Sequence, residues 1–354
     1  MSGIADTLNA MPIWLLVLIK SALLLFVVIT TFAYAMLFER KIMGWMQLRP
    51  GPNRVGPWGL LQPAADAVKM LFKEDLTPST ADPLIYKFAP FISLVSAFGA
   101  YAIIPFNEPT GGALWSIGNV NAGILFIFAL TAIGVYGVSL GGWASGSKYP
   151  LLGSVRATAQ MISYELAMTM SVIGVLIIAG TTSLAGIVHA QDRMWFVLPQ
   201  IFGFVIYFIT AVAETNRAPF DLVEADAELV AGFHTEYSGL RFGLFFIAEY
   251  VNMLTVSCIA TLLFFGGWNA PFGLTVIPGI VWFIMKVLFF LFCYIWLRAT
   301  LPRFRYDRLM AFGWKVLLPV AAVNLIATAV VVAVKDDDVD ETQQRPNSDA
   351  QAPV

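Results

Sequence analysis

Long apolar runs recur along the whole chain, and they restrict its fold more than any other feature. Eight runs can be distinguished, at about 13–37, 84–106, 121–142, 155–180, 194–213, 242–268, 274–298 and 312–334. About 20 apolar residues in a helix cross the hydrocarbon core of a bilayer. In lipid, a helix also satisfies its own backbone hydrogen bonds. The pattern predicts an all-α integral membrane protein with eight transmembrane helices in one polytopic domain, 1–334, followed by a disordered acidic tail, 335–354.

The composition agrees with a membrane environment and argues against several classes of site. The chain is 58% hydrophobic and 12% charged, about half the charged fraction of a soluble domain. Cys258 and Cys293 lie far apart, each within an apolar run, so neither a disulfide framework nor a C-x-x-C metal motif is present. The sequence contains no phosphate-binding Walker loop, dinucleotide fingerprint or nucleophile elbow. We therefore expect no metal ion and no cofactor to be bound by this chain itself.

The distribution of lysine and arginine predicts the orientation. The loops after runs 1, 3, 5 and 7 contain fourteen of these residues, including the edge residues Arg156, Arg241 and Arg298, and the opposite side contains three. Cytoplasmic loops carry the excess of positive charge. Both termini are therefore expected outside the cytoplasm, in a multi-pass protein of the bacterial cytoplasmic (inner) membrane.

An acidic segment separates the fifth and sixth runs. Between 213 and 236 it contains one cation, Arg217, and six carboxylates: Glu214, Asp221, Glu224, Asp226, Glu228 and Glu236. Carboxylates this close repel one another and perturb each other's proton affinity. The segment is either a solvated loop, a docking surface for a positively charged partner, or a site that takes up protons.

The first cytoplasmic loop contains an amphipathic pattern at 59–74. One helical face would carry Leu61, Ala65, Val68, Leu71 and Phe72, and the other Asp66, Lys69 and Lys73. The simple interpretation is an interfacial amphipathic helix. The alternative is that the helix forms the wall of an opening for a lipid-soluble substrate and presents Asp66 to it.

Charged residues inside the apolar runs are the second indication of function. Glu165, Glu249 and Lys286 lie well within their runs, and Lys20 lies about two turns from the outer end of the first. A charge facing lipid costs at least ~2.5–3.5 kcal/mol on insertion scales. A snorkelling side chain would explain Lys20. The others favour a proton or ion pathway, with a structural ion pair as the alternative.

Several motifs together resemble one known family. They are G-L-L-Q-P-A-A-D-A-V-K-M-L-F-K-E at 59–74, P-F-D-L-V-E-A-D-A-E at 219–228, E-R-K-I-M-G-W-M-Q-L-R-P-G-P-N-R-V-G-P at 39–57, E-Y-S-G-L-R-F-G-L-F-F-I-A-E-Y at 236–250 and P-R-F-R-Y-D at 302–307. From about residue 13 to 334, the sequence resembles the H-type (ND1-type) membrane component of respiratory complex I, the proton-pumping NADH:quinone oxidoreductase. The resemblance implies eight spans and a quinone chamber at the junction with a hydrophilic arm. FMN and the iron–sulfur clusters would lie in partner subunits, with further membrane subunits and lipid alongside.

The resemblance also implies roles for particular residues. A proton relay that couples quinone reduction to translocation would comprise Glu165, Glu214, Glu224, Glu228 and Glu249. The quinone chamber would be lined or braced by Arg40, Arg49, Asp66, Arg217, Asp221, Arg298 and Arg303. Two alternatives remain at this point: the matching component of a membrane-bound hydrogenase, and a proton-coupled secondary transporter. Copurification with a flavin and iron–sulfur arm, with nickel–iron subunits, or with neither would distinguish them.

Overall fold

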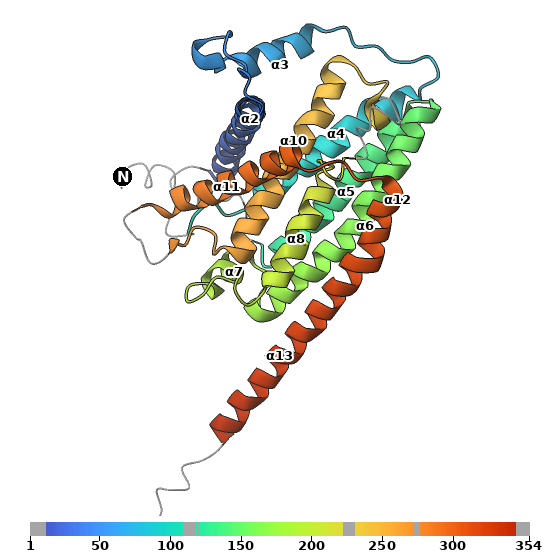
Figure 1. Ribbon diagram of the computed structural model, residues 1–354. Coiled ribbons are helices and arrows are strands. Elements are labelled where there is room, and N and C mark those ends of the chain that lie inside the picture. The colour runs from blue at the N-terminus through green and yellow to red at the C-terminus, as the bar shows by residue number, and fades with distance from the viewer. Residues whose placement is uncertain (1–11, 109–117, 119, 222–230, 272–276, 345–354) are drawn as a thin grey trace, which may run out of the picture.

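The computed structural model describes residues 12–108, 118, 120–221, 231–271 and 277–344. In these ranges the chain is helical, with no β-strand (Figure 1). The α-helices are α2 (Ile13–Met46), α3 (Gln62–Phe72), α4 (Pro83–Gly99), α5 (Gly123–Ala144), α6 (Lys148–Ala179), α7 (Leu184–Ala190), α8 (Ile201–Glu214), α10 (Gly239–Phe264), α11 (Gly279–Thr300), α12 (Tyr306–Phe312) and α13 (Leu318–Gln344). Short turns of 3-10 helix lie at Pro57–Gly59, Ala100–Ala102 and Gly232–His234, and a π-helical turn at Gly313–Leu317 joins α12 to α13.

The predicted all-helical membrane fold is confirmed, but the number of spans is not. Among the described residues, 7 helices are long and apolar enough to cross a bilayer. The fifth predicted span, 194–213, is the exception: 196–200 form turns and α8 has only 14 residues. At ~1.5 Å per residue α8 is roughly 21 Å long, shorter than a hydrocarbon core of about 30 Å. The apolar run is long enough, but Pro199 precedes a helix that begins only at Ile201.

Helix α10 forms the centre of the bundle. From Tyr250 to Phe264 nearly all of its side chains are buried, and it packs against α2, α3, α4, α6, α7, α8 and α11. An interior helix surrounded by other helices has no polar face, which explains why its sequence is apolar on every side. Polar groups on this part of α10 lie against protein: Tyr250 is buried and the Glu249 side chain is partly buried.

Small residues hold α4 and α5 close together. A Cβ atom added at Gly137 of α5 would lie 2.0 Å from the Ser93 Oγ atom of α4, and one at Gly134 would lie 2.9 Å from the Ser96 Oγ atom. Glycine is therefore required at Gly137, because any side chain would separate the helices. Such contacts between small residues are typical of helix packing in membranes.

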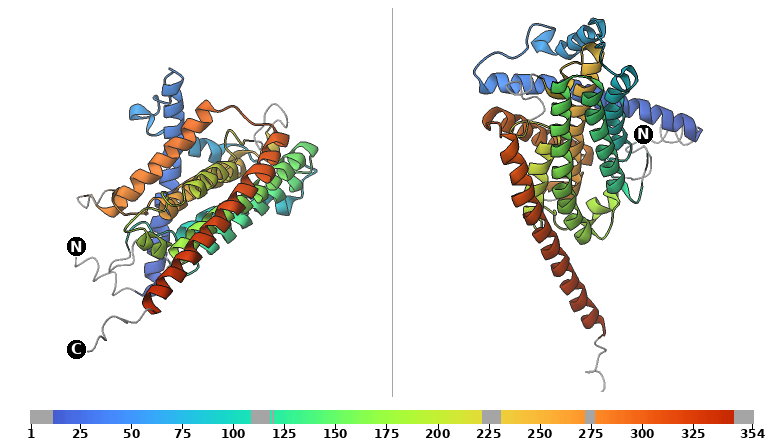
Figure 2. Two further views of the ribbon diagram at one scale, coloured as in Figure 1. Left: turned by 60° about the horizontal axis from the view of Figure 1, so that its bottom comes forward. Right: turned by 90° about the vertical axis from the view of Figure 1, so that its right-hand side faces the viewer.

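Helix α2 crosses the other helices instead of running parallel to them (Figure 2, right). It contains 34 residues, so it is roughly 50 Å long at ~1.5 Å per residue. Its last turns carry the chain to α3, which packs against α2 and α10. The predicted helix in the first loop is therefore present. Asp66 is its buried residue, whereas Val68, Leu71 and Phe72 are exposed.

The last span extends away from the bundle (Figure 1). α13 packs against α6 and α8 through its first part and continues to Gln344. The helix thus covers the beginning of the segment predicted as a disordered tail, 335–354. Residues 345–354 lie outside the described ranges.

Candidate functional site

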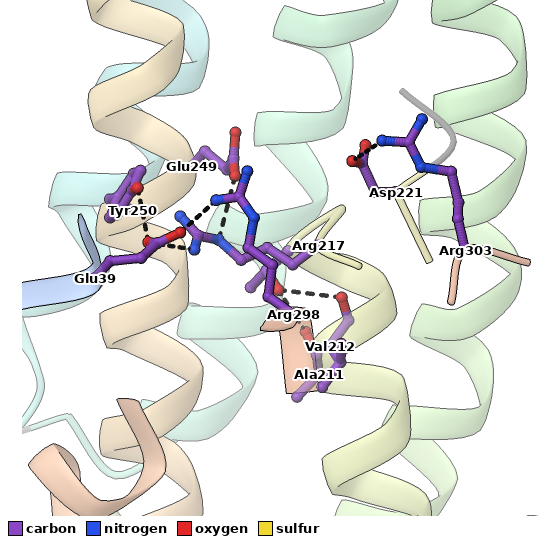
Figure 3. A network of polar contacts seen from close by, with 10 residues as sticks. Glu39, Ala211, Val212, Arg217, Asp221, Glu249, Tyr250, Arg298 and Arg303 are labelled. Carbon is purple, nitrogen blue, oxygen red and sulfur yellow. Dashed lines mark hydrogen bonds and ion pairs between the residues drawn. The ribbon is translucent and has the colours of Figure 1, made fainter. Parts of the chain in front are cut away.

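A buried carboxylate, Glu39, connects four elements near the end of α2 (Figure 3). Its Oε2 atom accepts hydrogen bonds from Arg217 Nη1 at 2.6 Å and from the Tyr250 hydroxyl at 2.8 Å. Its Oε1 atom accepts one from Arg298 Nη1. The Glu39 and Arg217 side chains are each 2% exposed. Helix α10, helix α11 and the segment after α8 therefore meet on one carboxylate of α2.

The end of α8 places Arg217 in this cluster. The Thr215 amide donates to the carbonyl of Ala211, and the Arg217 amide donates to the carbonyl of Val212 at 3.4 Å. Between them Asn216 has a φ of 51°, a left-handed conformation that commonly ends helices and that asparagine tolerates better than most residues. The chain therefore turns off the helix axis at this residue, and the Arg217 side chain enters the space between α2 and α10.

Arg217 is surrounded by negative charge and by an aromatic ring. Its Nε atom lies 3.4 Å from Glu249 Oε1, and its guanidinium carbon lies 4.1 Å from the centre of the Tyr250 ring. Burial by itself lowers the pKa of Arg217, but the charge of Glu39 and the contributions of Tyr250 and Glu249 outweigh it and raise that pKa above its ordinary value. The guanidinium therefore stays protonated throughout the physiological range.

Glu249 links the Glu39 cluster to a small, partly open cavity. The cavity has a volume of about 50 Å³, and Glu214, Asn216, His234 and Asn252 line it together with Glu249. A water molecule needs at least about 10–15 Å³ of such volume and two or more polar partners. The cavity can therefore hold a short chain of water molecules between Glu249 and Glu214.

Glu214 and Glu165 form the far side of this acidic group. Glu214 is the last residue of α8, and its Oε2 atom is buried without a hydrogen-bond partner among the described residues. Glu165, on α6, is close enough to act on Glu214 electrostatically. The structure thus brings together Glu165, Glu214 and Glu249, the three predicted relay residues that it describes. Glu224 and Glu228 lie outside the described residues.

The predicted chamber residues fall into separate groups. Arg40 Nη1 donates to Asp66 Oδ2 at 2.8 Å, and Gln62 Nε2 donates to Asp66 Oδ1 at 3.1 Å, so α2 and α3 are joined by a buried carboxylate. Arg49 is exposed and donates to Gln47 Oε1 at 2.7 Å. Among the described residues, no hydrogen bond or ion pair joins it to Arg40 or Asp66.

Arg217 is the one cation of the acidic segment in the sequence, but in the structure its partners come from other helices. Asp221 is paired with Arg303, whose Nη2 atom lies 2.8 Å from Asp221 Oδ2. Arg217 is paired with Glu39 and Glu249 instead. A sequence window shows only near neighbours, whereas folding supplies partners from α2 and α10 and from the segment after α11.

Lys286 has contacts that explain its burial without a proton pathway. Its Nζ atom donates to the backbone carbonyls of Phe265, Gly267 and Asn269 at 2.7, 2.9 and 2.7 Å. It also lies 4.7 Å from the centre of the Trp195 ring. These carbonyls follow the carboxyl end of α10, where a cation is favourable. Lys286 therefore stabilises the turn after α10.

The two cysteines are free, and Cys258 is buried in α10. Within the described parts of the chain, no group of three or more histidine, cysteine or acidic residues is arranged to hold a metal ion.

Sequence reasoning missed Glu39 and Tyr250, although both lie in motifs used for the family resemblance. Glu39 immediately precedes Arg40 at the end of an apolar run, and Tyr250 follows Glu249. A carboxylate at the end of a run could be explained by solvation, so only its burial in the structure distinguishes it. His234, an isolated histidine in the sequence, lines the cavity with Glu214 and Glu249.

Comparisons with known proteins agree on one family. The family model described as NADH dehydrogenase matches residues 19–329. An H-type subunit of NADH-quinone oxidoreductase from Symbiobacterium thermophilum is 52% identical over 91% of this chain and 99% of the relative. The H-type subunit from Deinococcus deserti is 52% identical over 91% of this chain and 86% of its own length. One from Geobacter metallireducens is 50% identical over 90% and 97%, respectively.

Proposed function

The chain belongs to the NADH dehydrogenase family, and from this premise we propose that it forms the membrane part of a quinone chamber and couples quinone reduction to proton translocation. Its relatives are subunits of NADH-quinone oxidoreductase, an enzyme complex. In this proposal the electrons reach the quinone from an iron–sulfur cluster in a hydrophilic partner, and FMN lies further upstream. This chain supplies residues that hold the quinone end of the chamber and residues that carry protons.

The observation that carries the proposal is the continuity between the Glu39 cluster and the acidic cavity. Glu249 belongs to both, because it pairs with Arg217 on one side and lines the cavity with Glu214 on the other. Glu165 extends the group into α6. A change of charge near Arg217 can therefore be followed by proton transfer into the helix bundle, through these titratable side chains and through water in the cavity.

The chemistry requires such a route. Reduction of a quinone to a quinol consumes two electrons and two protons, so negative charge develops at the quinone before protons arrive. Arg217 and Arg298 would stabilise that charge and at the same time hold Glu39. Glu39 and Glu249 share the guanidinium of Arg217. When one of these carboxylates loses its contact with the guanidinium, the affinity of that carboxylate for a proton changes. Glu249 would then exchange a proton with the cavity while Glu39 remains fixed by Arg298 and Tyr250.

The Arg40–Asp66 pair supports an entrance between α2 and α3. It fixes α3 on α2 through the buried face of α3, and the apolar residues of α3 are left on the outside. An interfacial helix of this kind would sit at the membrane surface with Leu71 and Phe72 in contact with lipid. A lipid-soluble quinone would pass beside it toward Asp66.

The orientation belongs to the same proposal. The bias of lysine and arginine predicts that α3, the Glu39 cluster and the segment after α11 lie on the cytoplasmic side. That is the side on which a hydrophilic electron-transfer arm would dock, in the bacterial inner membrane.

The test compares two reactions of the assembled complex. Arg217→Gln and Arg217→Lys are assayed for reduction of a short-chain quinone and, as an internal reference, for reduction of ferricyanide by the upstream arm. We expect both variants to keep the ferricyanide rate and Arg217→Gln to lose quinone reduction. Arg217→Lys should recover only a part, because an ammonium cannot hold two carboxylates in the geometry of a guanidinium. Arg305→Gln is the matched control, because Arg305 is exposed and pairs only loosely with Asp307 at 3.8 Å.

Two outcomes would contradict the proposal. Quinone reduction at the wild-type rate in both Arg217 variants would mean that the cluster is only structural. Purification of the chain without a flavin and iron–sulfur arm would remove the electron source on which the proposal depends.

A further inference from the structure

An apolar cavity lies between α2, α10 and α11, at the other end of α2 from the Glu39 cluster. It has a volume of about 300 Å³, and Leu24, Val28, Leu254, Phe283 and Val287 form part of its wall. Pockets that hold small ligands begin at about this size. The cavity is therefore large enough for a flexible hydrocarbon chain.

One charged side chain, Lys20, lines this cavity. Lys20 is 7% exposed, and within the described residues it has neither a hydrogen-bond nor an ion-pair partner. The neighbouring polar groups are satisfied inside the protein: the Tyr101 hydroxyl donates to the Val251 carbonyl at 3.2 Å, and the Thr31 hydroxyl donates to the Val27 carbonyl at 2.8 Å. A lysine side chain set in an apolar wall without a counter-charge is unfavourable. The site therefore favours an anionic group next to Lys20.

We propose that this cavity binds an anionic membrane phospholipid, with one acyl chain between α2 and α11 and the phosphate on Lys20. The site is complementary to such a lipid in both parts, because it combines an apolar wall with a single positive charge. Its rim includes Leu23, Ile284 and Leu288, each about half exposed, so a hydrocarbon chain can enter from the bilayer. A quinone would leave the ammonium without a counter-charge, and in a zwitterionic phospholipid the cation of the headgroup competes with Lys20 for the phosphate.

The position of Lys20 along α2 fits a headgroup. Lys20 lies about two turns after the start of α2 at Ile13, or roughly 10 Å at ~1.5 Å per residue. A lysine stem extends its ammonium several ångströms toward the membrane surface. Glu39 lies roughly 30 Å further along the same helix, so the lipid site is separate from the proposed quinone site.

The experiment measures lipid bound to the assembled complex. The complex is stripped of lipid in detergent, incubated with phosphatidylcholine vesicles that contain or lack phosphatidylglycerol, and purified again, and its bound lipids are counted by mass spectrometry. We compare the wild type with Lys20→Gln, Lys20→Arg and Ile284→Trp. The matched control is Lys335→Gln, which removes an exposed lysine from the other predicted outer end.

We expect the wild type, Lys20→Arg and Lys335→Gln to retain one more equivalent of phosphatidylglycerol than Lys20→Gln. Ile284→Trp should also lose this equivalent, because it narrows the rim and leaves the charge in place. Phosphatidylglycerol should raise the thermal midpoint of the wild-type complex, and it should not raise that of Lys20→Gln.

Three results would overturn the proposal. Equal retention of phosphatidylglycerol by the wild type and Lys20→Gln would show that Lys20 binds no lipid phosphate. Equal retention of both lipids by the wild type would show that charge is not recognised. A carbodiimide cross-link between Lys20 and a carboxylate of a neighbouring chain of the complex would show that protein, and not lipid, supplies the anion.

Discussion

The ion pair between Glu39 and Arg217 provides a quantitative test of the buried cluster. Removal of one partner of a buried pair costs about 3–5 kcal/mol, because the other charge is left buried and uncompensated. The lower end applies here: Glu39→Gln leaves Arg217 with Glu249 at 3.4 Å, and Arg217→Gln leaves Glu39 with Arg298 and Tyr250. We therefore expect each single variant to lose ~3 kcal/mol.

The double variant distinguishes a coupled pair from two independent contacts. Glu39→Gln with Arg217→Gln removes both charges, so the combined loss should be close to that of one single variant. The interaction free energy in the double-mutant cycle should then be about 3 kcal/mol, near the upper end of values for residues in contact. At ~2 °C per kcal/mol, each single variant lowers the thermal midpoint by roughly 6 °C.

The assay follows the fraction of complex that remains assembled after heating, by native gel electrophoresis of membranes. Single variants whose losses add fully in the double variant would refute the coupling. So would single variants with an unchanged midpoint.

The same measurement gives a pH dependence. The pKa of Arg217 is raised in the folded protein. Its contribution to stability is therefore fully present below the pKa that Arg217 has in the unfolded chain, and it is lost only as the pH rises through the still higher folded value. The difference in midpoint between the wild type and Arg217→Gln should stay constant from roughly pH 6 to pH 9. If this difference in thermal midpoint disappears toward alkaline pH, the titration of a group other than Arg217 determines the strength of the Glu39–Arg217 pair.

Three further predictions concern other parts of the molecule. Lys286→Met removes three hydrogen bonds from a charged donor, each worth about 1.5–3 kcal/mol. It should lower the thermal midpoint of the complex but leave the number of protons translocated per quinone unchanged. A lower number of protons per quinone would restore Lys286 to the pathway. Glu165→Gln keeps the shape and hydrogen bonding of the side chain but cannot release a proton, so the complex should assemble and lose coupled turnover; normal quinone reduction and pumping would remove Glu165 from the relay. A reporter fused after Val354 should lie outside the cytoplasm and one inserted near Gly51 inside, as tested by protease protection; a cytoplasmic carboxyl terminus would mean that a span had been miscounted.

Hydropathy predicted most of the fold because each helix that crosses a bilayer must be apolar over a fixed length. Seven of the eight runs correspond to helices of sufficient length. The remaining run contains α8, a helix of only 14 residues, so that span is not confirmed. A short helix that packs against other helices can be as apolar as a spanning helix, so composition cannot distinguish them. Packing of α8 against α6, α10 and α13 and the break before Ile201 determine its length.

The site was predictable as a set of residues but not as a set of pairs. Charges within apolar runs identified Glu165 and Glu249, because such residues are costly unless protein or water surrounds them. The partner of Arg217 was not predictable, since Glu39 lies 178 positions away in the sequence. The same holds for Asp221, whose partner, Arg303, follows α11. In both cases the nearest opposite charge in the sequence was not the nearest in space.

The length of α2 has a consequence for the bilayer itself. A helix of roughly 50 Å is longer than a hydrocarbon core of about 30 Å, so it must tilt or extend beyond the core, and its inclination responds to the membrane thickness as well as to packing. Because Glu39 is fixed to α10 and α11, a thinner or thicker bilayer would exert torque on the buried carboxylate through the whole helix. A change of acyl-chain length in reconstituted membranes should therefore strain the cluster that contains Glu39 and Arg217.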